Sequence, residues 1–239
     1  MKNLKRASAW MLLCVCIAGC AKKTTENDAP LTADQTTAKN QLEVQMKAAA
    51  QTAQTYHQMD SAALLSKLME QSKAQRESFN SPAYRELRTR TNVDSNALVA
   101  LVKQNDNAAG LLPLLLLRKL DNKSYLGVPA DIRAKILTDA LENSKFFNTW
   151  GLPGFYLEDA SYAMLEAGKS AVPALRRMLS NTRPAPLFGS QEAMLSDEYK
   201  YRVCDYALFF LRKIDGQDTF QLPTALPDRD SLIKQMPAK

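Results

Sequence analysis

Residues 165–179 read LEAGKSAVPALRRML, and residues 201–214 read YRVCDYALFFLRKI. In both stretches the apolar residues recur every three or four positions, the spacing that places them on one face of an α-helix. Gly168 marks a helix end, because glycine adopts at little cost the left-handed backbone that commonly closes a helix. We expect Ser170 to cap the short helix that follows. The strongest helix of the chain is predicted from Tyr199 to Ile214.

Helix-start signals also occur upstream of these stretches. Asp60, Ser81 and Asp94 or Ser95 each precede a periodic apolar segment, and their side chains suit the N-cap position. Pro129 begins another such segment, as proline often does. The β-branched alternation that indicates strands is nearly absent. The sequence therefore predicts an all-α fold of about seven to nine helices, and its 46% hydrophobic content suffices for a core.

The two quoted stretches resemble a HEAT-type repeat, in which a helix of the form VPALxxxL turns into a second helix of the form xRxxAxxAL. Pro173 matches the first-helix proline of that family, and Arg202, Asp205 and Ala207 fall within its second-helix pattern. One helical hairpin cannot bury its apolar face alone, so such repeats stack into a solenoid. The resemblance therefore implies a short α-solenoid of HEAT-like hairpins.

Weaker matches extend the resemblance over about residues 95–216. LLPLLLLRKLD at 111–121 and IRAKILTDALE at 132–142 repeat the apolar pattern, and LEDASYAMLEAG at 157–168 also resembles a second helix. Strict alternation cannot satisfy all of these assignments, so the repeat register stays open. A non-repetitive helical bundle with similar spacing is the alternative.

The N-terminal residues 1–20 read MKNLKRASAWMLLCVCIAGC and form a signal-peptide pattern, with three basic residues before an apolar run. That run, residues 7–19, is shorter than the roughly 20 residues of a transmembrane helix. Its end, Ile17 to Cys20, resembles the lipobox of bacterial lipoproteins. The resemblance implies cleavage before Cys20 and a thioether-linked diacylglycerol on that residue, with acyl chains such as palmitate for firm anchoring. Ordinary secretory cleavage beside a chance cysteine is the alternative.

The resemblance to lipoproteins also implies a location. Ala21 follows Cys20, whereas enterobacterial retention in the inner membrane would require Asp there. We expect the inner leaflet of a Gram-negative outer membrane, facing the periplasm. Removal of the signal's three cations lowers the net charge from +6 to +3. Cys204, in an apolar helical stretch, is then the one free thiol and is expected to be buried.

The chain is expected to have four parts: a signal peptide at 1–19, a lipidated tether at 20–57, an α-helical HEAT-like domain at 58–216 and a C-terminal tail at 217–239 with a possible short helix. The tether is polar, flexible or partly helical, because it cannot bury enough apolar surface to order itself. Alanine and glutamine favour helix near residues 41–54.

Composition and motifs weigh against several kinds of chemistry. The single histidine, His57, excludes an HExxH zinc site, and the mature chain lacks GxSxG, P-loop, CxxC and GxGxxG motifs. The basic residues are spread rather than clustered, which weighs against nucleic-acid binding. We therefore expect no metal, no cofactor and no catalytic residue. Glu158, Asp159 and Glu166 could serve a carboxylate-dependent hydrolase, but a solvated helix face explains them more simply.

Two long connections carry the candidate binding residues. Residues 181–198 interpose about 18 residues where a HEAT hairpin turns in a few, and loops of this length are often functional. Their cationic, partly apolar tip could contact a partner, with Arg183 binding a carboxylate in bidentate fashion. The aromatic connection 144–156 could supply a hot spot. Packing against the solenoid is the alternative for both. The partner-binding candidates are Arg183, Pro184, Pro186, Leu187, Phe188 and Trp150.

These observations favour a membrane-anchored periplasmic lipoprotein that acts as a non-enzymatic, protein-binding scaffold in the cell envelope. A carboxylate-dependent envelope hydrolase and a self-associating structural lipoprotein are the alternatives. The partner's identity and the oligomeric state do not follow from the sequence.

Overall fold

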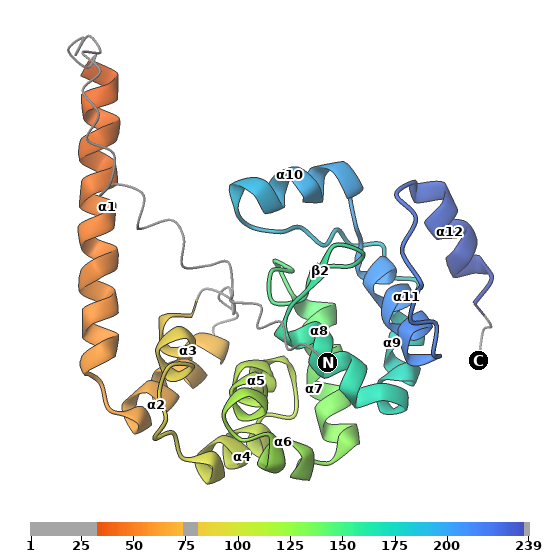
Figure 1. The fold of residues 1–239 in the computed structure, drawn as a ribbon, viewed down its shortest axis with the longest axis horizontal. Coiled ribbons are helices and arrows are strands. Elements are labelled where there is room, and N and C mark those ends of the chain that lie inside the picture. Colours follow the sequence, from red (N-terminus) through yellow and green to blue (C-terminus); the bar gives the residue numbers. More distant parts are fainter. Residues whose placement is uncertain (1–32, 74–80, 237–239) are drawn as a thin grey trace, which may run out of the picture. The chain divides into compact units, whose positions relative to one another are not determined.

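The computed structural model describes residues 33–73 and 81–236, so the expected signal peptide and Cys20 lie outside the described residues (Figure 1). Within them the chain is mostly helical, which confirms the predicted all-α class. Contacts divide the chain after Ala48 into two units, and each is described by itself.

Helix α1 spans Ala33–Gln58 and is 26 residues long. It contains the 41–54 stretch for which composition predicts partial helicity, and it begins in the first unit and ends in the second. In the second unit its last turn is fixed by hydrogen bonds. The Gln71 amide donates to the Tyr56 hydroxyl at 2.8 Å, and an Arg90 Nη2 donates to the His57 carbonyl at 2.8 Å. His57 also lies 3.1 Å from a Glu86 carboxylate oxygen.

The remaining elements of the second unit are short helices and one hairpin of strands (Figure 1). Helices that follow one another in sequence pack as pairs, α2 with α3, α4 with α5 and α7 with α8, and α9 packs with α11 across the intervening α10. In chain order the elements are α2 (Ser61–Lys73), α3 (Pro82–Leu87), α4 (Ser95–Gln104), η3 (Ala108–Gly110), α5 (Leu111–Leu120), α6 (Asn122–Gly127), α7 (Ala130–Asn143), β1 (Gly151–Leu152), β2 (Tyr156–Leu157), α8 (Asp159–Ala167), η4 (Gly168–Ala171), α9 (Val172–Met178), α10 (Ser190–Tyr199), α11 (Val203–Ile214) and α12 (Leu226–Lys234).

The predicted helix starts are confirmed where a side chain can cap. Asp60, Ser81 and Asp94 each accept a hydrogen bond from a backbone N–H two or three residues later, at 2.7, 3.1 and 2.8 Å. Such caps satisfy backbone donors that have no partner within the helix. Pro129 is the N-cap residue of α7.

The prediction that Ser170 caps the next helix is wrong. Gly168 ends α8 with φ of +57°, as predicted, but residues 168–171 then form the 3₁₀ turn η4. Helix α9 follows with Ala171 as its N-cap and with proline in its first turn, and no side chain caps it. Proline suits that turn because its missing N–H has no helical partner there.

The predicted 18-residue connection 181–198 and the predicted helix from Tyr199 to Ile214 are both wrong in their boundaries. Residues 190–199 form α10, and α11 begins at Val203. Lys200 separates the two helices, because its left-handed backbone (φ +48°, ψ +48°) ends α10. The Asp205 carboxylate, which accepts from the Arg202 backbone N–H at 2.9 Å, then caps the start of α11.

The predicted aromatic loop contains a two-stranded antiparallel hairpin, in which Gly151 pairs with Leu157 and Leu152 with Tyr156. Gly151 has φ of +76°, and a Cβ on it would lie 2.6 Å from the Tyr156 carbonyl oxygen. Only glycine fits this position.

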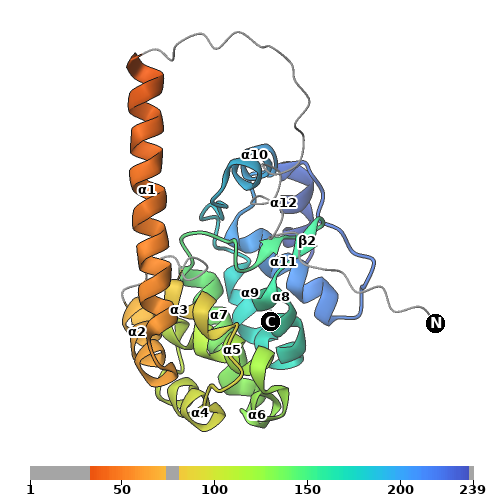
Figure 2. The ribbon, with the colours of Figure 1, turned by 60° about the vertical axis from the view of Figure 1, so that its left-hand side comes forward.

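The core of the second unit is continuous from α2 to α11. Every residue of α5 from Leu111 to Leu117 is buried, and Cys204 is 1% exposed, as its apolar neighbours predict. Within this unit α10 and α12 lie at the end opposite α4 and α6, as both ribbon views show (Figures 1 and 2). The long connections therefore meet at one end of the unit.

Candidate partner-binding surface

Hydrogen bonds fix the two long connections against each other. The backbone N–H of Phe147 donates to the Pro186 carbonyl at 2.8 Å. The Asn148 side chain then bonds both backbone groups of Phe188: its Nδ2 donates to the carbonyl and its Oδ1 accepts from the N–H, each at 2.7 Å. Residues that are more than 30 positions apart in the sequence thus form one rigid surface.

Arg183 holds this arrangement in place. Its Nη2 donates to the Glu142 carbonyl at 2.6 Å and its Nη1 to the Ser144 carbonyl at 2.7 Å, at the C-terminal end of α7. A cation at that end also interacts favourably with the helix dipole. Both terminal nitrogens are therefore engaged by backbone carbonyls, so the fork that could bind a partner's carboxylate is already used within the chain.

Two of the predicted binding residues lie in the core. Trp150 is fully buried, its Nε1 donates to the Ser144 hydroxyl at 3.1 Å, and its ring packs edge-on against Phe210. Leu187 is 4% exposed. Neither side chain is presented to a partner, because each fills the space beneath the connection that carries it.

The other candidates lie at the surface. Pro184 is exposed, Pro186 is half-buried, and the Phe188 side chain is 52% exposed. The Phe188 ring packs edge-on against Phe146 with 5.7 Å between centroids. This part of the predicted site is an aromatic pair on a fixed backbone.

A second aromatic pair lies at the other end of α10. Phe155, 52% exposed at the tip of the β1–β2 hairpin, packs against the ring of Tyr199 at 4.8 Å between centroids. Between the two pairs, Met194 on α10 is 73% exposed. The Ser196 hydroxyl accepts from the Leu187 N–H at 3.2 Å and ties α10 to the connection before it.

Met194 was not among the predicted residues, because the sequence did not predict α10. The signal was present: Leu195 and Tyr199 are four positions apart and both pack against the core, which is the spacing of one helix face. This apolar stripe is short and lies between polar residues, so the helical periodicity of the sequence is weak there.

The carboxylates considered for a hydrolase lie on α8 or at its start. Asp159 forms an ion pair with Arg88 at 2.9 Å. Glu166 accepts two hydrogen bonds from Arg118, at 2.9 and 2.6 Å, and this contact lowers the pKa of Glu166. Glu158 has the opposite shift, because burial and then the neighbouring Asp159 raise its pKa.

Two further arginines are buried. Arg229, on α12, is 1% exposed and lies 3.4 Å from a carboxylate oxygen of the fully buried Asp205. Arg133, on α7, is 7% exposed, with its guanidinium 4.7 Å from the centre of the Tyr125 ring. Arg229 also donates to four backbone carbonyls, those of Pro223, Thr224, Tyr199 and Lys200.

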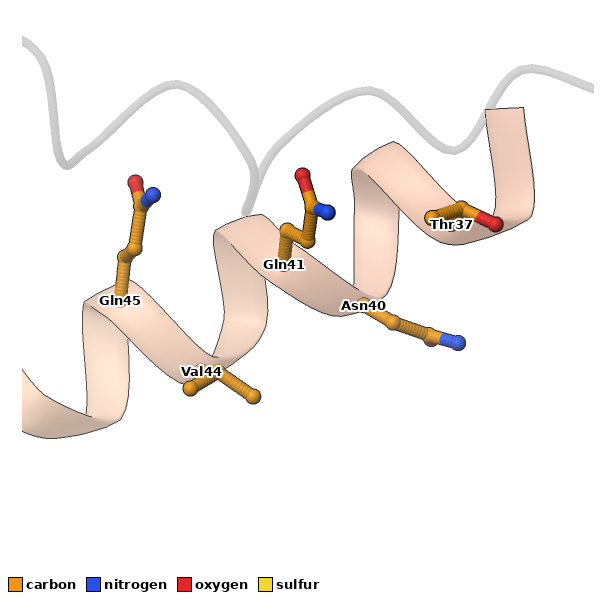
Figure 3. A pocket seen from close by; sticks show the side chains of 5 residues that line it. All are labelled: Thr37, Asn40, Gln41, Val44 and Gln45. Atoms are coloured by element: carbon orange, nitrogen blue, oxygen red, sulfur yellow. The ribbon is translucent and has the colours of Figure 1, made fainter. Parts of the chain in front are cut away.

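The first unit contains a hollow of 390 Å³ whose described lining comes from one face of α1 (Figure 3). Ligand sites usually have polar groups converging from several elements. The lining side chains here belong to one helix and carry no charge, so they do not define a binding chemistry. They are Thr37, Asn40, Gln41, Val44 and Gln45.

No helix among residues 33–73 and 81–236 is long and apolar enough to cross a membrane. In the same residues no three His, Cys, Asp or Glu side chains are grouped so as to hold a metal ion.

Comparison of the chain with family models, with curated proteins and with solved structures gave no match.

Proposed function

We propose that this protein is a lipoprotein, anchored through Cys20 in the inner leaflet of a bacterial outer membrane, whose helical domain binds a protein partner in the periplasm without catalysing a reaction. The lipobox-like Ile17 to Cys20 supports the anchor. The HEAT-like sequence and the packing of α9 against α11, which correspond to the first and second helices of the resemblance, support a short solenoid.

The observation that carries the binding proposal is the fixed aromatic surface where the two long connections meet. Phe155 and Phe188 are each 52% exposed, yet their backbones lie on a hairpin and on a hydrogen-bonded connection. Aromatic side chains on a preorganised backbone lose little conformational freedom on binding, which is why they often dominate interfaces.

The test is in-cell photo-cross-linking with the full-length protein. A photoreactive residue at position 155 should form an adduct with one specific protein, and the Phe188→Ala change should reduce the adduct about tenfold. Leu126→Ala is the matched control, because Leu126 on α6 is 57% exposed and lies at the opposite end of the second unit. Equal loss in both variants, or no adduct from position 155 or 188, would contradict the proposal.

The anchor is tested separately by labelling with a radioactive fatty acid. The label should enter the wild-type protein and be absent from Cys20→Ala. Retention of label in the variant would contradict lipidation at Cys20.

The alternative function, an envelope hydrolase, would need a carboxyl group of raised pKa beside an ionised one. Glu158 has a raised pKa and Glu166 a lowered one, but eight helical positions separate them by about 12 Å along the axis, more than the spacing of a glycosidase pair. The ion pair with Arg118 explains by itself why the pKa of Glu166 is lowered. A hydrolase requires that Glu158→Gln abolish degradation of purified peptidoglycan, and equal rates in wild type and variant would remove this alternative.

A further inference from the structure

The outward face of α10 has a composition that restricts what can bind there. Met194, Asp197 and Glu198 lie three and four positions apart and share this face. All three are exposed, Met194 by 73%. The inward face carries Leu195 and Tyr199, which pack against the core. We call the exposed face the α10 surface.

The α10 surface is negatively charged within a chain of positive net charge. Helix α10 contains three acidic residues, Glu192, Asp197 and Glu198, and no lysine or arginine. Within the described residues Asp197 and Glu198 form no ion pair or side-chain hydrogen bond. The field of Glu192 also reaches Tyr156 on the hairpin, whose pKa burial and this charge raise to about 12.

The position of these carboxylates restricts the partner. A protein that covers Met194 must also cover Asp197 or Glu198, because they follow within one helical turn. A carboxylate that loses water without gaining a cation or donor opposes association. Methionine adapts its shape to different apolar surfaces, so specificity must come from the charges beside it.

We propose that the α10 surface docks a basic amphipathic helix of the protein partner, in which an apolar residue covers Met194 while lysine or arginine side chains three or four positions away meet Asp197 and Glu198. This inference rests on the proposed binding function and adds the chemistry of the partner.

The first experiment places a photoreactive residue at position 194 of the full-length protein and measures adduct formation in cells. The double change Asp197→Lys and Glu198→Lys should reduce the adduct at least about tenfold, because two attractive contacts become repulsive. Asp218→Lys makes the same kind of change at another exposed acidic residue, in the segment between α11 and α12, and should leave the adduct unchanged.

The outcomes separate the two proposals. An adduct from position 194 that survives the double reversal overturns the basic-helix inference and leaves the binding function intact. Adducts from position 155 or 188 without an adduct from position 194 would also overturn the basic-helix inference and leave the binding function intact. No adduct from any of these positions overturns the binding function itself.

A purified probe tests the chemistry directly. A fluorescent helical peptide of leucine, alanine and lysine should bind the full-length protein in detergent, and the peptide with glutamate in place of lysine should not. Binding of the lysine peptide should weaken in the double reversal but not in Asp218→Lys, and should weaken with added salt. Equal binding of both peptides, or equal weakening in both variants, contradicts the inference.

Discussion

Arg229 and Arg133 are both buried against a tyrosine ring, but they differ in the acceptors around their guanidinium groups. Each guanidinium lies over a tyrosine ring, 4.9 Å from the centre of Tyr201 and 4.7 Å from that of Tyr125. Arg229 has the carboxylate of Asp205 and four backbone carbonyls around it. Within the described residues the Nε and Nη1 of Arg133 are buried without a hydrogen-bond partner, whereas in Arg229 this holds for Nε alone.

The difference teaches that burial alone does not tell whether a charge stabilises a fold. A guanidinium stays protonated when buried, so its contribution depends on the acceptors that replace water. Arg229 lies in a cluster where two arginines meet two aspartates, with Arg202 bridging Asp205 and Asp230 at 2.9 and 2.7 Å. The charge of Arg133 acts on Glu166, which is already paired with Arg118 at 2.6 Å, so these three groups carry a net positive charge.

The largest effect is expected from Arg229→Met. This change removes the donor of four carbonyl contacts and leaves Asp205, which is fully buried, with one arginine instead of two. We expect a loss of about 3–5 kcal/mol in the free energy of unfolding, the range for breaking a buried ion pair. Urea unfolding followed by circular dichroism measures it. A loss below about 1 kcal/mol would show that α12 is not held to the rest of the second unit by this residue.

An intermediate effect is expected where an ion pair is partly exposed. Glu166 is 40% exposed and Arg118 is 24% exposed, so solvent screens their paired contact. We expect Glu166→Gln to reduce the free energy of unfolding by about 1 kcal/mol or less at pH 7.

The pH dependence of that difference identifies its cause. The folded pKa of Glu166 is lowered, so its contribution is present above the unfolded pKa of about 4.3 and is lost as the pH falls through the folded value. The difference between wild type and Glu166→Gln should therefore be constant above about pH 5 and shrink below about pH 4. A difference that persists unchanged at pH 3 would point to lost packing.

The smallest effect is expected from Arg133→Met, the same substitution at a similarly buried site. It removes the contact of the guanidinium with Tyr125, and it relieves two buried unpaired nitrogens. These terms oppose each other, so the change in unfolding free energy should lie within about 1 kcal/mol of zero. A loss as large as that of Arg229→Met would remove the contrast between the two sites.

Local features of the fold were predictable from the sequence, whereas contacts between distant segments were not. Asp60, Ser81 and Asp94 cap helices because the interaction spans only two or three residues. The boundary of α10 was missed because its inward apolar stripe is short. In addition, Lys200 adopts a left-handed backbone, which a glycine at that position would have indicated but a lysine does not.

The candidate site shows the same division. Residues 181–198 and 144–156 were predicted as candidate binding connections from their length and aromatic content. The roles of Arg183 and Trp150 were not, because they depend on which carbonyls and rings the folded chain brings to them. Arg183 contacts α7 across about 40 positions of sequence, and no local pattern contains that information.

The burial of Cys204 has a practical consequence for thiol labelling of the folded domain. Burial raises the pKa of its thiol to about 11, so at neutral pH the reactive thiolate is scarce and shielded from reagents. Among residues 33–73 and 81–236, a cysteine introduced on the surface, for instance at position 194, would be the one that maleimide dyes or spin labels reach. The folded domain is thus ready for fluorescence and distance measurements on the native sequence background, without removal of its own thiol.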